Sequence, residues 1–235
     1  MQSPLILLHG ATGAAEQLQP LAAKLADAGE VQLFDFPGHG HKTMPEAPFS
    51  ISFFAEALLA YIREHSWEQV NLFGYSMGGY VALYLARHHP ETVNRIITLA
   101  TKFHWDEATA AKEVRMLDPD TILTKVPAFA AALEQRHRAC DWKDVLQRTR
   151  EMMLAMGQNN PLQPADYADI CKETLVLLGD RDKMVGPEET LAVHKALPEA
   201  QLGILPDTPH PVEQADTELL AGIIQRFLMR PQAAR

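Results

Sequence analysis

A serine within a run of small residues is the position in this sequence whose surroundings most clearly indicate chemistry. Residues 74–79 read Gly-Tyr-Ser-Met-Gly-Gly, a G-x-S-x-G pattern centred on Ser76. An apolar run at 70–73 precedes it and a helical run at 80–89 follows it, the context in which this pattern exposes a nucleophile. Small flanking residues permit a strained turn that lifts the hydroxyl to a helix N-terminus. We therefore predict that Ser76 is the nucleophile of an acyl-transfer reaction.

A serine hydroxyl attacks a carbonyl only when a base removes its proton, and the base needs a carboxylate to orient it. Asp182 lies just after the apolar run at 174–178, and His210 lies in the loop after the run at 201–205. Asp180 is an alternative acid, but it adjoins the strand end, where turn residues commonly cap the backbone locally. We predict Asp182 as the acid and His210 as the base, and we expect the other histidines to be surface or packing residues.

The oxyanion formed during acyl transfer needs rigid hydrogen-bond donors, and backbone N–H groups meet this need best. The first apolar run ends in His-Gly-Ala-Thr-Gly at 9–13, where small residues let a substrate approach the backbone. We predict that the N–H groups of Ala11 and Met77 form the oxyanion hole.

The elements that position these residues follow from short apolar runs spaced along the chain. Five of the six runs are closed by His, Gly, Asp or Pro, as is typical of buried parallel strands, and helical periods lie between the runs. The runs span residues 5–8, 31–34, 70–73, 95–99, 174–178 and 201–205. This alternation predicts an α/β fold with a mostly parallel sheet of about six strands flanked by helices.

One interval is far too long for a simple crossover between strands. It runs from Leu99 to Thr174, several times the length of about 10 to 12 residues that a crossover needs. We predict that residues 102–168 form a helical cap inserted after the fourth strand, and that residues 1–101 and 169–235 form the core domain. Helices are expected at 108–117, 128–137 and 142–156, with Pro119, Pro127, Pro161 and Pro164 as breaks.

Apolar side chains of the predicted cap are candidates for the substrate pocket, because thioethers and aromatic rings fill irregular apolar spaces. The candidates are Phe103, Trp105, Met152, Met153 and Met156. Packing within the cap itself is the alternative for these side chains. The basic run at 136–138 is a candidate anion site, but the near balance of charges in the cap favours a solvated helix face.

Segments that match a known family span nearly the whole chain. They are residues 9–10, 35–40, 74–79 and 179–185, and His210 with Glu213. On these segments the sequence resembles the alpha/beta hydrolase fold family. The resemblance implies Ser76 as nucleophile, Asp182 as acid and His210 as base. Two features depart from the family: the usual N-terminal antiparallel hairpin is absent, so a shortened sheet is expected, and prolines flank His210 where a glycine usually precedes the histidine.

Composition excludes several other classes of protein. The 235 residues carry a formal net charge of −9, which argues against nucleic-acid binding because such proteins need a clustered positive field. No basic leader and no apolar stretch of about 18 residues is present, so we expect a cytoplasmic protein without a membrane partner. The sequence lacks phosphate-binding, dinucleotide and metal-ligand motifs, so we predict a small-molecule substrate, no cofactor and no metal. The oligomeric state is not predicted.

The leading functional hypothesis is a carboxylesterase-like serine hydrolase that acts on small uncharged esters through an acyl-enzyme, since no basic side chain adjoins the nucleophile motif. Alternatives on the same fold are carbon–carbon bond hydrolysis, perhydrolysis and a lyase step like that of the menaquinone-pathway synthase. That synthase usually has an arginine after its paired glycines, and Tyr80 stands at this position, which lowers the lyase alternative. A non-catalytic ligand-binding member of the fold is the remaining alternative.

Overall fold

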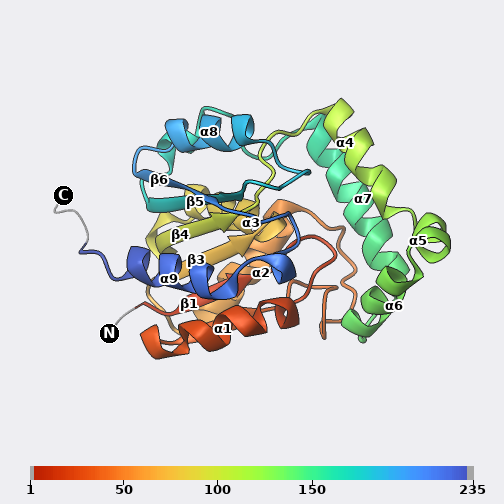
Figure 1. The fold of residues 1–235 in the computed structure, drawn as a ribbon, viewed down its shortest axis with the longest axis horizontal. Helices are drawn as coiled ribbons and strands as arrows, with labels where there is room; N and C mark the ends of the chain where they lie inside the picture. The colour runs from red at the N-terminus through yellow and green to blue at the C-terminus, as the bar shows by residue number, and fades with distance from the viewer. Residues whose placement is uncertain (1–2, 232–235) are drawn as a thin grey trace.

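The core of the protein is one parallel sheet. A computed structural model describes residues 3–231, and its six strands are hydrogen-bonded in the order β2-β1-β3-β4-β5-β6 (Figure 1). The strands are β1 (Leu5–Leu8), β2 (Val31–Phe34), β3 (Val70–Tyr75), β4 (Val93–Leu99), β5 (Glu173–Gly179) and β6 (Ala200–Leu205). Every neighbouring pair of these strands is parallel. The prediction of an α/β fold with a six-stranded parallel sheet is confirmed.

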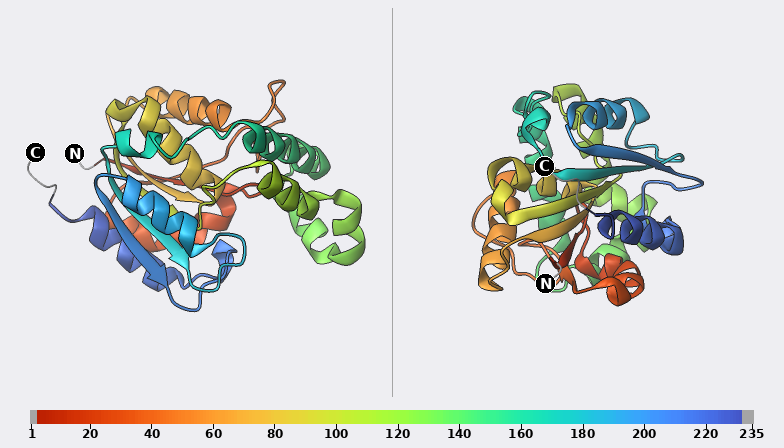
Figure 2. Two further views of the ribbon diagram at one scale, coloured as in Figure 1. Left: turned by 90° about the horizontal axis from the view of Figure 1, so that it is seen from above. Right: turned by 90° about the vertical axis from the view of Figure 1, so that its left-hand side faces the viewer.

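Helices cover both faces of the sheet, which is why its strands are nearly continuous apolar runs. Leu5 and Leu7 pack toward one face, with α1 (Gln19–Leu25) and α9 (Thr217–Leu228). Ile6 and Leu8 pack toward the other face. That face is covered by α2 (Ile51–Glu64), α3 (Met77–His88) and α8 (Pro187–Ala196) (Figure 2). The alternation of side chains along each strand thus builds two cores, one on each side of the sheet.

The parallel arrangement gathers the residues singled out in the sequence at one edge of the sheet. His9 follows β1, Ser76 follows β3, Asp182 follows β5 and His210 follows β6. Because the carboxyl ends of parallel strands lie at the same edge, residues far apart in the sequence meet there, where α/β folds commonly bind ligands.

The long interval between β4 and β5 folds into a helical insertion that stands to one side of the sheet (Figure 1). Its helices are α4 (Glu107–Glu113), α5 (Pro119–Lys125), α6 (Pro127–Arg136) and α7 (Trp142–Gln158). Trp142 and Leu146 of α7 belong to a small core of the insertion itself. Met152 and Met156 of the same helix belong to the main core beside the sheet. The helix α7 therefore joins the insertion to the sheet.

Two of the prolines expected as breaks separate successive helical segments and begin the second of each pair. Pro119 and Pro127 are the first residues of α5 and α6, where the missing N–H costs no helical hydrogen bond. Asp118 caps α5, because its side chain accepts the Thr121 N–H at 2.7 Å. The helical segments before them end at Leu117 and Lys125, so the breaks expected at these two positions are present, and α5 is a helix that the apolar pattern does not predict.

Candidate active site

Ser76 occupies the turn between β3 and α3 in a backbone conformation that few residues adopt. Its φ is 51° and its ψ is −116°, a strained combination for a residue with a side chain. The Ser76 N–H donates to the Leu99 carbonyl at 2.8 Å, and the Thr101 hydroxyl donates to the Ser76 carbonyl at 3.1 Å. Contacts at the end of β4 therefore hold the strained turn and leave the serine half-buried at the start of α3.

The turn is this tight because Gly74 and Gly78 carry no side chain. A Cβ on Gly74 would lie 2.3 Å from the backbone of Gly78, and a Cβ on Gly78 would lie 2.5 Å from the carbonyl oxygen of Leu8. Both obstacles are backbone atoms, which cannot move aside as a flexible side chain would. The glycines of the G-x-S-x-G pattern thus let β1, β3 and α3 converge around Ser76.

The structure brings His210 and Asp182 into direct contact. His210 Nδ1 lies 2.8 Å from Asp182 Oδ2, and Asp182 Oδ1 accepts the N–H groups of Met184 and Val185 at 2.8 and 2.9 Å. Burial by itself raises the pKa of Asp182, but the hydrogen bonds from His210 and from the two amides outweigh burial and hold this pKa below its usual value. Asp182 is therefore ionised at neutral pH, and it orients the ring with Nδ1 protonated and Nε2 free to accept a proton.

Asp180, the alternative acid, has a different partner. Its Oδ1 accepts the Thr208 N–H at 3.1 Å, and the neighbouring Arg181 N–H donates to the Thr208 carbonyl at 3.1 Å. Gly179 allows this close approach, since a Cβ there would lie 2.0 Å from the Thr208 carbonyl oxygen. Asp180 thus positions the loop that carries His210 without contacting the imidazole.

The loop after β1 is fixed by a buried histidine. His9 Nδ1 lies 2.8 Å from the carbonyl of the next residue, and Nε2 accepts the Phe36 N–H at 3.1 Å. Burial lowers the pKa of His9 to about 3, so the ring is neutral at physiological pH. Ala11 follows this anchored residue, and Met77 begins α3, where the first N–H groups of a helix have no partner within it. Both predicted oxyanion donors lie in residues that line one small cavity with Ser76.

Ser76 and His210 line the same cleft, which has a volume of about 590 Å³. We call it the broad cleft. The insertion contributes an apolar wall made of Met116, Leu117, Phe129 and Met153. The cleft also has a polar part, made of Gln17, Arg136, Glu213 and Gln214. A molecule bound in the broad cleft therefore reaches the serine and the histidine together, beside the insertion.

A much smaller cavity, which we call the small cavity, adjoins Ser76 beside α7. It has a volume of about 40 Å³. Its lining includes four of the five apolar residues singled out from the sequence, Trp105, Met152, Met153 and Met156. These side chains therefore surround the nucleophile, whereas the fifth candidate, Phe103, does not line this cavity.

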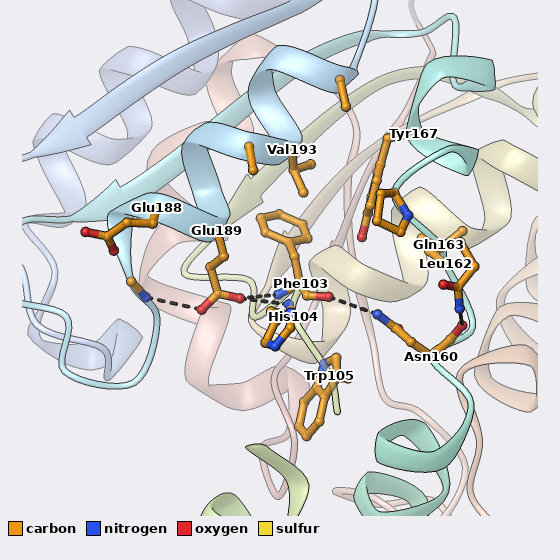
Figure 3. A pocket seen from close by; sticks show the side chains of 14 residues that line it. Phe103, His104, Trp105, Asn160, Leu162, Gln163, Tyr167, Glu188, Glu189 and Val193 are labelled. Carbon is orange, nitrogen blue, oxygen red and sulfur yellow. Dashed lines mark hydrogen bonds between the residues drawn. The ribbon is translucent and has the colours of Figure 1, made fainter. Parts of the chain in front are cut away.

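Phe103 lines a third cavity of about 670 Å³, which we call the outer cavity (Figure 3). Glu189 of α8 fixes the chain here, because its carboxylate accepts the N–H groups of Phe103 and His104 at 2.8 and 2.9 Å. Asn160 donates to the Phe103 carbonyl at 3.2 Å from the opposite side. Phe103 is therefore held between α8 and the segment that leaves α7, and it lines neither of the two spaces that Ser76 lines.

Two basic residues shape the site in ways that differ from the expectations. Arg136 was expected on a solvated face, but its side chain is only 17% exposed and donates to the Thr12 carbonyl at 3.1 Å, because the end of α6 packs on the loop after β1. Lys102 lines the small cavity beside Ser76, where no basic residue was expected, but its ammonium donates to the Met184 carbonyl at 2.8 Å. Its ammonium lies 3.6 Å from Glu113 and 3.6 Å from Glu189, and these two carboxylates balance its charge.

His137, expected as a surface or packing residue, joins the insertion to the sheet domain. Its Nδ1 accepts the Gly40 N–H at 3.1 Å, and its Nε2 lies 3.0 Å from the Thr12 carbonyl. These contacts connect residues 97 and 125 positions apart, and no local pattern in the sequence indicates them.

Residues 3–231 contain neither a cluster of metal-binding side chains nor a helix that could span a membrane. No group of three or more His, Cys, Asp and Glu side chains within this range could hold a metal ion. Within the same range, no helix is both long and apolar enough to cross a lipid bilayer.

Known proteins resemble this chain in both sequence and structure. The model of a family described as alpha/beta hydrolase fold matches residues 3–212. A 2-(acetamidomethylene)succinate hydrolase of Mesorhizobium japonicum is 23% identical over 245 residues, covering 96% of this chain and 88% of that protein. A pimeloyl-acyl-carrier-protein methyl ester esterase of Vibrio cholerae is 32% identical over 118 residues, which are 50% of this chain and 43% of that esterase.

Solved structures show the same architecture. The enol-lactonase from Burkholderia xenovorans LB400 has a TM-score of 0.79 at 19% sequence identity, covering 98% of this chain and 92% of that chain. A thermophilic esterase from Thermogutta terrifontis has a TM-score of 0.75 at 23% identity, covering 97% of this chain and 90% of that chain. At these identities the likeness concerns the fold alone.

Proposed function

This chain belongs to the alpha/beta hydrolase fold family, and we propose that it is a serine hydrolase that cleaves small uncharged carboxylic esters through an acyl-enzyme at Ser76. In this proposal His210 is the general base, Asp182 orients it, and the N–H groups of Ala11 and Met77 bind the oxyanion. One observation carries the proposal: His210, held by Asp182 at 2.8 Å, lines the same cleft as Ser76.

The proposed reaction has two halves. In the first, the Ser76 proton passes to Nε2 of His210 while the serine oxygen attacks the ester carbonyl. The carbonyl oxygen becomes an oxyanion within reach of the two backbone N–H groups. His210, stabilised by Asp182, then gives the proton to the leaving alcohol as the carbon–oxygen bond breaks. In the second half, water takes the place of the alcohol, and the acid and free Ser76 are released.

The substrate class rests on the surroundings of the nucleophile. The small cavity is lined mainly by apolar side chains, and the one lysine in its lining has its ammonium balanced by two carboxylates. We propose that the insertion acts as a cap that excludes bulky polymers from the broad cleft. The half-length match to a methyl ester esterase supports ester chemistry.

Replacement of the nucleophile tests the proposed mechanism. A fluorophosphonate should label Ser76 of the wild type, and Ser76→Ala should lose about 10⁴ to 10⁶ in kcat on short-chain esters. Circular dichroism checks that the variant is folded. A folded Ser76→Ala protein that retains most of the activity would remove Ser76 from the mechanism.

A substrate panel tests the proposed class. We expect kcat/KM to be higher for neutral short-chain esters than for matched dicarboxylate half-esters or long-chain triglycerides, because neither an anion nor a long acyl chain suits the small cavity. A clear preference for either of the latter would contradict the proposed class. Hydrolysis of β-diketones without hydrolysis of esters would favour the carbon–carbon alternative.

A further inference from the structure

Two spaces of very different size meet at Ser76. The small cavity has about 40 Å³ and the broad cleft about 590 Å³. Ser76 lines both, as do Ala11 and Met153. An ester has two parts that extend in different directions from its carbonyl carbon, so each space can receive one part.

The position of His210 decides which part lies in which space. His210 lines the broad cleft and is absent from the lining of the small cavity. The group that protonates the leaving oxygen must be in contact with it, so the alcohol part lies in the broad cleft. The acyl part then extends toward Met77, Met152 and Met156 in the small cavity. A space of this size holds on the order of three water-sized groups, which suits an acetyl or propionyl group.

Trp105 lies at the boundary of the small cavity. It lines the outer cavity (Figure 3) and also the small cavity, and among the residues that the structure describes these spaces of about 670 and 40 Å³ share no other lining residue. The indole Nε1–H donates to the Lys102 carbonyl at 3.2 Å, and Glu189 holds the adjoining backbone through Phe103 and His104. Trp105 is therefore fixed in place as a partition.

Tyr80 supports the same boundary. It lines the small cavity, and its hydroxyl accepts the Leu162 N–H at 2.9 Å and donates to the side chain of Asn160. Leu162 and Asn160 both line the outer cavity. The lining of the outer cavity includes the apolar side chains of Phe103, Leu162 and Val193, so it would suit a hydrocarbon chain once the partition is removed.

We propose that Trp105 sets the acyl-chain length of the substrate, so that the enzyme takes esters of short acids with large alcohols. The proposal rests on the proposed serine-hydrolase function. It assigns the acyl group to the small cavity, the alcohol to the broad cleft, and the limit on chain length to the indole of Trp105.

The test uses 4-nitrophenyl esters with acyl chains of two, four, six and eight carbons. The wild type should prefer the acetate over the octanoate by about 100-fold in kcat/KM, since one methylene that does not fit costs about tenfold or more. Trp105→Ala should join the small and outer cavities and raise the octanoate-to-acetate ratio at least about tenfold. Trp105→Leu, which keeps more of the packing, should raise the ratio in the same direction, and Trp105→Phe should stay nearer to the wild type.

Phe129→Ala is the matched control, because Phe129 lines only the broad cleft among these spaces. It should leave the octanoate-to-acetate ratio unchanged and alter the relative kcat/KM of acetate esters with small and bulky alcohols. A wild type without acyl-length preference, or folded Trp105 variants with an unchanged ratio, would overturn the assignment of Trp105 while Ser76-dependent hydrolysis persists. Absence of ester hydrolysis together with absence of Ser76 labelling would overturn both this proposal and the proposed function.

Discussion

Asp180 and Asp182 lie two positions apart, yet their carboxylates have different partners because their surroundings differ. The side chain of Asp182 is only 1% exposed and lies against His210 and two backbone amides. Asp180 is partly exposed and accepts the Thr208 N–H. From residue type and spacing alone, either carboxylate could be the partner of His210. The direction in which each side chain leaves the loop decides which of them contacts the imidazole.

Substitution of each aspartate by asparagine should distinguish an orienting acid from a loop residue. In Asp182→Asn the carbonyl oxygen stays with the Met184 and Val185 amides, so the NH₂ group faces His210 and forces the wrong tautomer, with Nε2 protonated. We expect kcat on short esters to fall about 10⁴-fold. Asp180→Asn keeps an acceptor for the Thr208 N–H and should lose less than about tenfold. Similar losses in both variants, or the reverse order, would contradict the assignment of the acid.

At the scale of elements, one arginine ties the last helix to the sheet. Arg95 of β4 is 4% exposed, and its Nε donates to Glu173 at 2.6 Å. The same guanidinium donates to the carbonyls of Phe227 and Arg230 at 3.3 and 2.7 Å. Carbonyls at the end of a helix lack partners within the helix, and a cation there is favoured by the helix dipole. Arg95 therefore satisfies the end of α9 and packs it on the sheet.

Removal of this guanidinium should destabilise the protein. We expect Arg95→Met to lower the free energy of unfolding by about 3 kcal/mol, because it removes the guanidinium from its buried ion pair with Glu173 and from the helix-end carbonyls. Arg226 lies on the exposed side of α9, so Arg226→Met is the matched control. It should change the free energy of unfolding by less than about 0.5 kcal/mol. Urea unfolding of both variants measures the difference in the free energy of unfolding. Equal stability of the two variants would contradict this role of Arg95.

At the scale of the whole molecule, three buried histidines lie where the insertion meets the sheet domain. The ring of His39 lies 5.1 Å from that of His9 and 5.7 Å from that of His137. Burial lowers the pKa of all three, that of His9 to about 3. The loops after β1 and β2 and the end of α6 therefore meet around neutral imidazoles.

This cluster predicts that stability falls in acid. Between pH 6.5 and about 3 the unfolded chain binds a proton on His9 that the folded protein does not bind, so the free energy of unfolding decreases as the pH is lowered through this window. Each such histidine contributes up to about 1.4 kcal/mol per pH unit. His9→Gln, which can still accept the Phe36 N–H, should reduce this slope between pH 6.5 and 5 by about that amount.

Urea unfolding at several pH values measures the slope. His41→Gln is the matched control, since His41 is exposed, and it should leave the slope as in the wild type. A wild type whose stability is independent of pH over this window would contradict the neutral, buried state of the histidines, as would a His9→Gln variant with an unchanged slope.

The sequence by itself determined the sheet and the order of the residues proposed for catalysis. Each strand is a short apolar run, which is a local property, and parallel strands bring their carboxyl ends to one edge wherever they lie in the chain. The G-x-S-x-G turn is equally local, because a Cβ on its glycines would clash with atoms a few residues away or with one neighbouring strand. For this reason Ser76, Asp182 and His210 could be selected before their geometry was known.

Only the tertiary structure decided how the insertion packs and what it encloses. The place of Arg136 depends on its contact with Thr12 across 124 positions, and the surroundings of Lys102 depend on Glu189 of a later helix. Phe103 and Trp105 lie two positions apart, yet only Trp105 reaches the small cavity. The spaces on either side of Ser76 are what remains between side chains that come from separate elements and pack against one another. The hydrophobic pattern of the sequence predicts which side chains are buried, but it does not determine which of them contact each other.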